Sequence, residues 1–279
     1  MEIRQLGTKI GAEVVGADVR TMSDVDFEKI YQAWLNFNVI CVRGQQLDID
    51  DYVRYSNRFG CVVEHPSKNT RYPGRPEVTL LGANKFDENG KLKLAVYKRG
   101  GDDFHTDGSY EKVPFKATQL YALAIPTQGG DTLFASTYAA YDALPTQLKQ
   151  RIEHLAASYI YGGRQKIAID LLNQEDRNKA PVVHTLVRVH PETGRKALYF
   201  DPNKILKIEG LPKDEGDALI EELRGYMVQP DAQYRHKWSK GDIVIWDNRC
   251  SYHKAAADYP PEQERIHWRV SIKDPADLH

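Results

Sequence analysis

Apolar residues recur at helical spacing near the start of this chain. Between Phe27 and Leu35 they return every three or four positions, which is the repeat of one face of an α-helix. Ser23 precedes this repeat as a potential N-cap, and aspartates occupy the first turn, where the helix dipole favours them. We therefore predict an amphipathic helix that begins after Ser23. A second helix is expected after Asp48, with Gly60 closing it.

Short apolar or alternating runs predict strands along much of the remaining chain. The runs at 182–189 and 196–200 flank a Pro-Glu-Thr-Gly turn sequence and are expected to pair as a hairpin. Helices are expected over 138–155, interrupted at Leu144-Pro145, and from Asp214 onward. The other expected strands are short pieces within 9–19, then 39–42, 78–81, 118–124, a turn and strand at 129–134, 234–238, 243–246 and 266–272.

Strands dominate the second half without the regular strand–helix alternation of a parallel sheet. We predict a mainly β fold with flanking helices, of the double-stranded β-helix (jelly-roll) barrel type. The 279 residues are expected to form a single domain, 1–279. Its polar stretch 65–101, rich in Gly and Pro, is interpreted as an active-site lid, with an idle surface excursion as the alternative, and 160–180 as a loop.

Composition excludes several classes of function. Lys and Arg number 38 against 39 Asp and Glu, so a net charge of -1 gives no bulk attraction for nucleic acid or an anionic membrane. No run of about 18 apolar residues is present, and the N-terminus has no apolar signal segment. Three cysteines in no metal-binding spacing favour a reducing compartment. We expect a cytoplasmic protein.

The sequence contains candidate metal ligands at two distant places. His105 and Asp107 stand at i and i+2, so on an extended chain both side chains leave the same face. A second stretch near the other end of the chain brings in His253. Two histidines and one carboxylate are the ligand pattern of non-haem Fe(II) oxygenases, which leaves positions open for a cosubstrate and O2. Alone, the short His-x-Asp motif is weak evidence.

Two arginines follow these ligands. Arg265 and Arg269 are four residues apart, so on a strand both face the same side. A 2-oxo acid that binds iron through its keto oxygen and C1 carboxylate needs a cation for its far carboxylate, and the arginine fork matches that group. The alternative is that both arginines are solvated on an outer face.

These motifs together resemble the taurine dioxygenase / 2,4-dichlorophenoxyacetate dioxygenase family of Fe(II)- and 2-oxoglutarate-dependent oxygenases. The similarity runs through nearly the whole chain. The matching motifs are His105-Thr106-Asp107, Gly129-Gly130-Asp131-Thr132, Trp246-Asp247-Asn248-Arg249 leading to His253, and Arg265-Ile266-His267-Trp268-Arg269.

The resemblance implies a role for each matched residue. His105, Asp107 and His253 would bind Fe(II), and Thr132 with Arg265 would hold the far carboxylate of 2-oxoglutarate. Arg269 matches a position that grips an anionic substrate group, and His65 is a looser match to a substrate-contacting histidine. Gly101 departs from the taurine enzyme, which has an Asn there, so taurine itself is in doubt.

We therefore expect a dioxygenase that uses Fe(II), 2-oxoglutarate and O2 to hydroxylate a small anionic substrate. The candidate substrates are a sulfonate, a sulfate ester and a carboxylate such as a phenoxyalkanoate. Because Asp107 fills the position that related halogenases leave empty for halide, the residue argues for hydroxylation. The alternatives are desaturation, epimerisation or cyclisation at the same iron centre, and a non-catalytic metal- or 2-oxoglutarate-binding barrel. Relatives imply a homodimer or homotetramer.

The remaining histidines and cysteines have simpler interpretations. We expect ordinary barrel or surface roles for four histidines and a small buried hydrophobic role for Cys250. The four histidines are His184, His190, His236 and His267.

Overall fold

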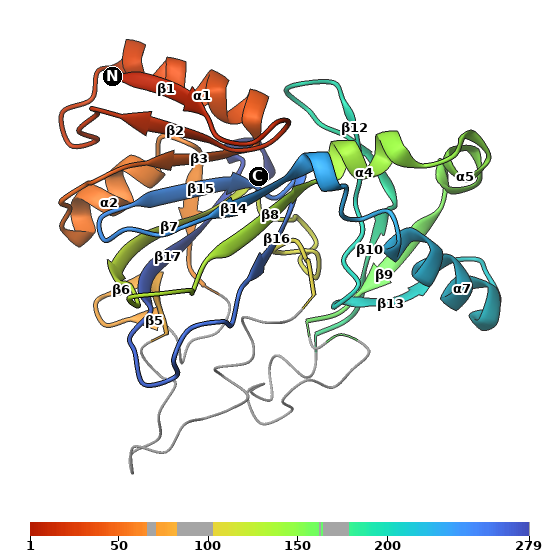
Figure 1. Cartoon of the computed structure of the whole chain (residues 1–279). Helices are drawn as coiled ribbons and strands as arrows, with labels where there is room; N and C mark the ends of the chain where they lie inside the picture. The colour runs from red at the N-terminus through yellow and green to blue at the C-terminus, as the bar shows by residue number, and fades with distance from the viewer. Residues whose placement is uncertain (66–70, 83–102, 162, 164–178, 279) are drawn as a thin grey trace.

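The computed structural model describes residues 1–65, 71–82, 103–161, 163 and 179–278. These residues form a mainly β structure with a few helices, which confirms the predicted class (Figure 1). The helices are α1 (Asp24–Phe37), α2 (Ile49–Ser56), α4 (Thr137–Ala143), α5 (Thr146–Ile152) and α7 (Lys213–Arg224), with 3-10 turns η4 (Pro230–Ala232) and η5 (Pro275–Leu278).

The largest sheet has nine strands, with β15 and β7 in its middle. Its neighbours pair antiparallel except β2 and β3, which are parallel. The strands are β1 (Glu2–Gln5), β2 (Ala12–Val15), β3 (Val39–Val42), β15 (Ile243–Asp247), β7 (Ala117–Ala124), β17 (Ile266–Lys273), β6 (Arg75–Leu81) and β5 (Arg71–Tyr72), with β4 (Cys61–Val63) paired to β17.

Helices α1 and α2 cover one face of this sheet (Figure 1). α1 lies over β1–β3, and α2 lies over β17 and β4. Both begin where the sequence predicts. The Ser23 hydroxyl accepts the backbone N–H of Asp26 at 3.1 Å, and the Asp48 carboxylate accepts that of Asp51 at 2.8 Å. The second helix ends earlier than expected, at Ser56. Aromatic and branched side chains of both helices pack on the sheet and bury the central part of this face.

The opposite face of the large sheet packs on a second, three-stranded sheet. This sheet has the order β14 (Gln233–His236), β8 (Thr132–Ser136) and β16 (Ser251–Ala255). Alternation along the strands separates the two faces: Ile40 and Val42 of β3 face the helices, whereas Val39 and Cys41 join a core between the two sheets. β3 and β15 are buried along their whole length because both of their faces are covered.

A third group of strands lies on the other side of the molecule, beside α5 and α7 (Figure 1). β9 (Ala156–Tyr159) pairs with both β10 (Val182–Thr185) and β13 (Ile205–Ile208). The expected hairpin is therefore wrong in its first half: only β11 (Val187–Val189) pairs with β12 (Lys196–Leu198). The run divides at the fully buried Leu186, whose N–H bonds the carbonyl of Leu155 and whose own carbonyl accepts the N–H of Tyr199.

The expected lid and loop are only partly described. Within 65–101, residues 71–81 form β5 and β6 at the edge of the large sheet, so this part is not an irregular loop. The rest of that range beyond His65 and Gly82, and residues 162 and 164–178 of the expected loop, lie outside the described residues. The lid stays a prediction. No helix among the described residues is long and apolar enough to cross a membrane.

Candidate active site

The structure brings together the three residues predicted to bind metal. His105 and His253 face each other across an antiparallel β-bridge, in which each backbone N–H donates to the other's carbonyl, at 3.1 and 2.9 Å. Their ring centroids are 4.2 Å apart. Each of the three residues, Asp107 included, offers one ligand atom within 4.8 Å of the others. Paired backbones therefore set the two imidazoles side by side.

The protonation of these groups suits a divalent cation. Nδ1 of His105 lies 3.1 Å from the carbonyl of Asp103, which can only accept, so Nδ1 carries a proton and Nε2 is the ring nitrogen left for a metal. Burial, together with the nearby His105, lowers the pKa of His253 to about 3, so this imidazole is neutral. Its Nδ1 has no hydrogen-bond partner among the described residues. Two imidazoles and one carboxylate are a donor set that fits Fe(II).

Two further groups hold the Asp107 carboxylate. The Thr118 hydroxyl donates to Oδ2 at 2.8 Å, and Nη2 of Arg269 lies 2.9 Å from Oδ1. Burial alone would raise the pKa of Asp107, but Arg269 and the two histidines hold it below its usual range. Nη1 of Arg269 lies 3.4 Å from Nε2 of His65. The two candidate substrate-binding residues thus adjoin the candidate metal ligands.

Arg265 enters the same region from the start of β17. Its Nε donates to the carbonyl of Gly130 at 2.6 Å, and its Nη2 donates to the hydroxyl of Thr132 at 3.1 Å. In the described part of the chain, no carboxylate lies within ion-pair distance of it. The two nearby acids, Asp131 and Asp258, pair with Arg235 instead. Burial lowers the pKa of Arg265 to about 10, which still leaves it charged at neutral pH.

Burying a cation without an anion is costly, because the protein replaces its hydration only in part. Arg265 is 9% exposed, and its known partners are a neutral carbonyl and a neutral hydroxyl. The Arg265 guanidinium is therefore a suitable binding group for an anionic ligand. A carboxylate with which the guanidinium can form two parallel hydrogen bonds would complete its coordination.

Sequence reasoning overlooked several residues that support this site. Trp238 donates its indole N–H to Thr132 at 3.0 Å, and Asn248 donates its amide to Thr118 at 3.0 Å. Asn248 stands in a motif that the sequence analysis singled out, so its place there was a usable signal. Thr118 and Trp238 are ordinary strand or loop residues in the sequence, and only their neighbours in space mark them.

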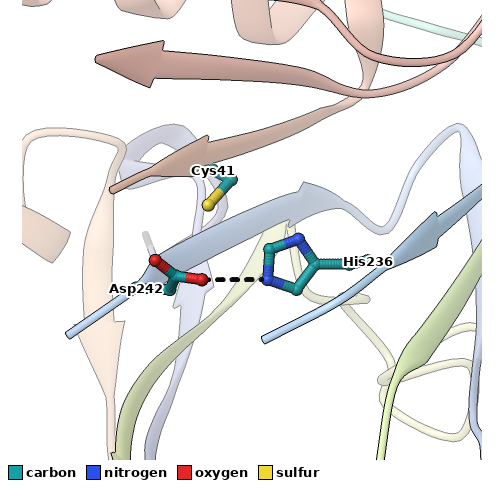
Figure 2. Close-up of side chains that lie close together, drawn as sticks. All are labelled: Cys41, His236 and Asp242. Atoms are coloured by element: carbon teal, nitrogen blue, oxygen red, sulfur yellow. Dashed lines mark ion pairs between the residues drawn. The ribbon is translucent and has the colours of Figure 1, made fainter. Parts of the chain in front are cut away.

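A second group of potential metal ligands lies between the sheets. Cys41, His236 and Asp242 are fully buried and point toward one another, with Nε2 of His236 3.5 Å from Oδ2 of Asp242 (Figure 2). That carboxylate oxygen also accepts Nη1 of Arg43 at 2.7 Å and the backbone N–H of Ser239 at 2.8 Å. Because Arg43 already compensates the carboxylate, we interpret the group as a structural polar cluster, in line with the expectation for His236.

His190, Asp247 and Cys250 form the third such group among the described residues. Nδ1 of His190 accepts the backbone N–H groups of Glu192 and Thr193, both at 3.2 Å, so the proton is on Nε2. Nε2 donates to Asp247 at 3.0 Å. The lone pairs that a metal would need are occupied, which agrees with the structural role expected for His190.

Comparisons with known proteins identify the family to which the chain belongs. The family model described as "Taurine catabolism dioxygenase TauD, TfdA family" matches residues 2–271. A (S)-phenoxypropionate/alpha-ketoglutarate-dioxygenase of Sphingobium herbicidovorans is 31% identical over 99% of this chain and 96% of its own length. Pentalenolactone F synthase of Streptomyces avermitilis is also 31% identical, over 99% of this chain and 96% of its own length.

A solved structure extends the likeness to the fold. It is that of a putative alpha-ketoglutarate-dependent taurine dioxygenase from Burkholderia xenovorans, with a TM-score of 0.81 and 28% identity. The match covers 97% of this chain and 92% of that one. The similarity is therefore not confined to the short motifs around the metal ligands. The chain belongs to the TauD, TfdA family of 2-oxoglutarate-dependent dioxygenases, whose reaction uses Fe(II), 2-oxoglutarate and O2.

Proposed function

We propose that this protein is an Fe(II)- and 2-oxoglutarate-dependent dioxygenase that hydroxylates a small anionic organic substrate. One oxygen atom of O2 enters the substrate and the other enters succinate, which forms as 2-oxoglutarate loses CO2. The observation that carries the proposal is the buried guanidinium of Arg265, which pairs with no carboxylate among the described residues and lies in the same site as two histidines and an aspartate. The substrate classes in view are sulfonates, sulfate esters and carboxylates such as phenoxyalkanoates.

His105, Asp107 and His253 would hold Fe(II), which when bound supplies the redox chemistry that activates O2. The protein's part is to keep the His253 imidazole neutral and the Asp107 carboxylate charged, which the lowered pKa values of both groups support. Three protein ligands leave half of an octahedron for the cosubstrate and O2.

Arg265 and Thr132 would bind the far carboxylate of 2-oxoglutarate. The hydroxyl oxygen of Thr132 accepts hydrogen bonds from both Trp238 and Arg265, so its two lone pairs are used. Its own hydrogen is then available to donate to an anion. The guanidinium and the hydroxyl together would offer charge and directed donors to one carboxylate.

Arg269 is our proposed binder of the substrate anion, with His65 beside it. The guanidinium already contacts Asp107 through Nη2, so an anion on another of its N–H groups would lie next to the metal ligands. This placement would bring the carbon beside the anionic group close to the iron. The jelly-roll barrel is the fold that we propose around the site, supported by the two sheets that share one core.

A different oxidation at the same centre is the second candidate. The relative named pentalenolactone F synthase, 31% identical, favours it. Desaturation, epimerisation or cyclisation would use the same protein groups and add no oxygen atom to the product. The mass of the product separates a gain of one oxygen from a loss of two hydrogens.

The test is succinate release by full-length protein with Fe(II), ascorbate and 2-oxoglutarate, on a panel of sulfonates, sulfate esters and phenoxyalkanoates. We expect substrate-dependent succinate and a product heavier by one oxygen, both lost in His105→Ala. Tight 2-oxoglutarate binding without succinate for any compound would favour the non-catalytic binding barrel. The cytoplasmic location and the homodimer or homotetramer stay predictions.

A further inference from the structure

A row of buried polar side chains runs from the core to the Asp107 carboxylate. Trp246 at the end of β15 donates its indole N–H to Oδ1 of Asn248 at 3.0 Å. Nδ2 of Asn248 donates to the hydroxyl of Thr118 on β7 at 3.0 Å. The Thr118 hydroxyl donates to Oδ2 of Asp107 at 2.8 Å. Trp246, Asn248 and Thr118 are each at most 2% exposed.

The direction of every bond in this row follows from its two ends. An indole N–H can only donate, so the atom of Asn248 that faces Trp246 must be the amide oxygen. The amide NH2 therefore faces Thr118 and donates to its oxygen. An ionised carboxylate can only accept, so the hydrogen of Thr118 lies toward Asp107. No other arrangement of the Asn248 amide satisfies both neighbours, which removes the usual ambiguity of an amide flip.

The backbone of Asn248 binds the same segment again. Its carbonyl accepts the hydroxyl of Thr106 at 2.8 Å, and its N–H donates to the carbonyl of Lys116 at 3.0 Å. Asn248 thus ties the residue between the two metal ligands to the strand that bears Thr118. All four of its hydrogen-bonding groups are engaged, and a rotation of its side chain would break two buried bonds.

We propose that Thr118, oriented by Asn248 and Trp246, is a positioning residue that fixes the Asp107 carboxylate for metal binding. A carboxylate oxygen has two lone pairs, so the bond from Thr118 leaves one on Oδ2 for a cation. The row fixes the rotation of the carboxylate before the metal binds, which reduces the conformational entropy that is lost on binding. The inference rests on the proposed function, because it takes Asp107 as a metal ligand, and it assigns a role to residues outside the ligand set.

The experiment measures the affinity of metal-free protein for Co(II) alone, by the visible absorption of the bound ion. Thr118→Val keeps the shape and removes the hydroxyl, and we expect it to raise the Co(II) dissociation constant by about 10- to 100-fold, the usual effect of losing such a partner. Thr118→Ser restores the hydroxyl and the affinity. Trp246→Phe removes the indole N–H and allows the Asn248 amide to rotate, and we expect a smaller loss of Co(II) affinity. Thr137→Val removes a buried hydroxyl that has no described hydrogen-bond partner, and it serves as the matched control with wild-type affinity.

Circular dichroism and urea unfolding establish that each variant is folded. A Co(II) dissociation constant for Thr118→Val equal to that of the wild type overturns the proposal. So does a Thr118→Ser variant as weak as Thr118→Val, because the hydroxyl would then not be the group that matters. If Thr118→Val does not fold, wild-type affinity in Trp246→Phe overturns it. Absence of Co(II) binding by folded wild-type protein would instead contradict the proposed function.

Discussion

At the scale of single residues, Arg265 is the most informative group in the protein. It is a buried cation whose described hydrogen bonds go to neutral oxygens of Gly130 and Thr132. Arg269, by contrast, is paired with Asp107. Arg269 lies in β17 and Arg265 directly precedes it, but only the charge of Arg269 is compensated by a carboxylate among the described residues. Arg265 gains more from an incoming carboxylate, which is why we assign it to the cosubstrate.

Arg265→Met should weaken 2-oxoglutarate binding without destabilising the protein. The lost charge-assisted bonds correspond to about 1.5–3 kcal/mol, or a 10- to 150-fold higher dissociation constant. Because an uncompensated buried charge is removed, the urea midpoint should not fall. Titration calorimetry of the anaerobic Mn(II) form measures the affinity.

The control is Arg151→Met, which makes the same chemical change in an exposed ion pair with Glu215 and should leave the affinity unchanged. An affinity of Arg265→Met within twofold of the wild type would contradict the assignment.

At the scale of elements, the turn between β15 and β16 determines where His253 lies. Asp247 ends β15 and accepts three hydrogen bonds from Arg249, through its backbone N–H, Nε and Nη2. It also accepts Nε2–H of His190 from the turn before β12. Burial alone would raise the pKa of Asp247, but Arg249 and His190 hold it below its usual range. The motif residues Asp247 and Arg249 therefore support the turn that precedes the strand of His253, our proposed metal ligand.

Asp247→Asn should destabilise the folded state strongly. The amide NH2 would face the donors of Arg249 or His190, and Arg249 would lose its buried counter-charge. Breaking a buried ion pair in this way typically costs about 3–5 kcal/mol. Urea unfolding of the metal-free protein measures the loss.

Asp142→Asn, in an exposed pair 3.9 Å from Arg195, is the matched control and should change stability by less than about 0.5 kcal/mol. Equal midpoints for the two variants would refute the proposed support.

At the scale of the whole molecule, buried histidines make the fold sensitive to acid. Burial lowers the pKa of His184, His236 and His267. Both ring nitrogens of His267 lack hydrogen-bond partners among the described residues. Below an ordinary histidine pKa of about 6.5, the unfolded chain therefore binds more protons than the folded protein. Stability rises with pH wherever the unfolded state holds more protons, so it must fall as the solution is acidified.

The free energy of unfolding should therefore decrease as pH falls from 7 to 5. Each histidine that titrates only in the unfolded chain contributes up to about 1.4 kcal/mol per pH unit. Urea unfolding of metal-free protein across this range measures the slope. His267→Leu should show a shallower slope, whereas His154→Leu, at an exposed position, should keep that of the wild type. A flat profile in the wild type would contradict the prediction.

Local patterns in the sequence predicted several of the elements and the candidate metal ligands. The repeat after Ser23 predicts α1, because helical spacing and a cap are properties of neighbouring residues. Buried runs predict β3 and β15 for the same reason. The i, i+2 spacing of His105 and Asp107, with the motif that ends in His253, was sufficient to propose the metal site.

Contacts between distant residues were decided by the tertiary structure. The sequence pattern of 182–189 is one run, but β9 pairs with its first half, and no local rule contains that partner. Likewise, Thr118 and Asn248 are 130 residues apart, and their bond exists only because β7 and β15 are neighbours in the sheet. The pattern of a strand specifies the face of the sheet on which a side chain lies, whereas sheet order and register specify which residues that side chain contacts. The candidate ligands could therefore be proposed from the sequence, whereas the groups that contact and orient them could not.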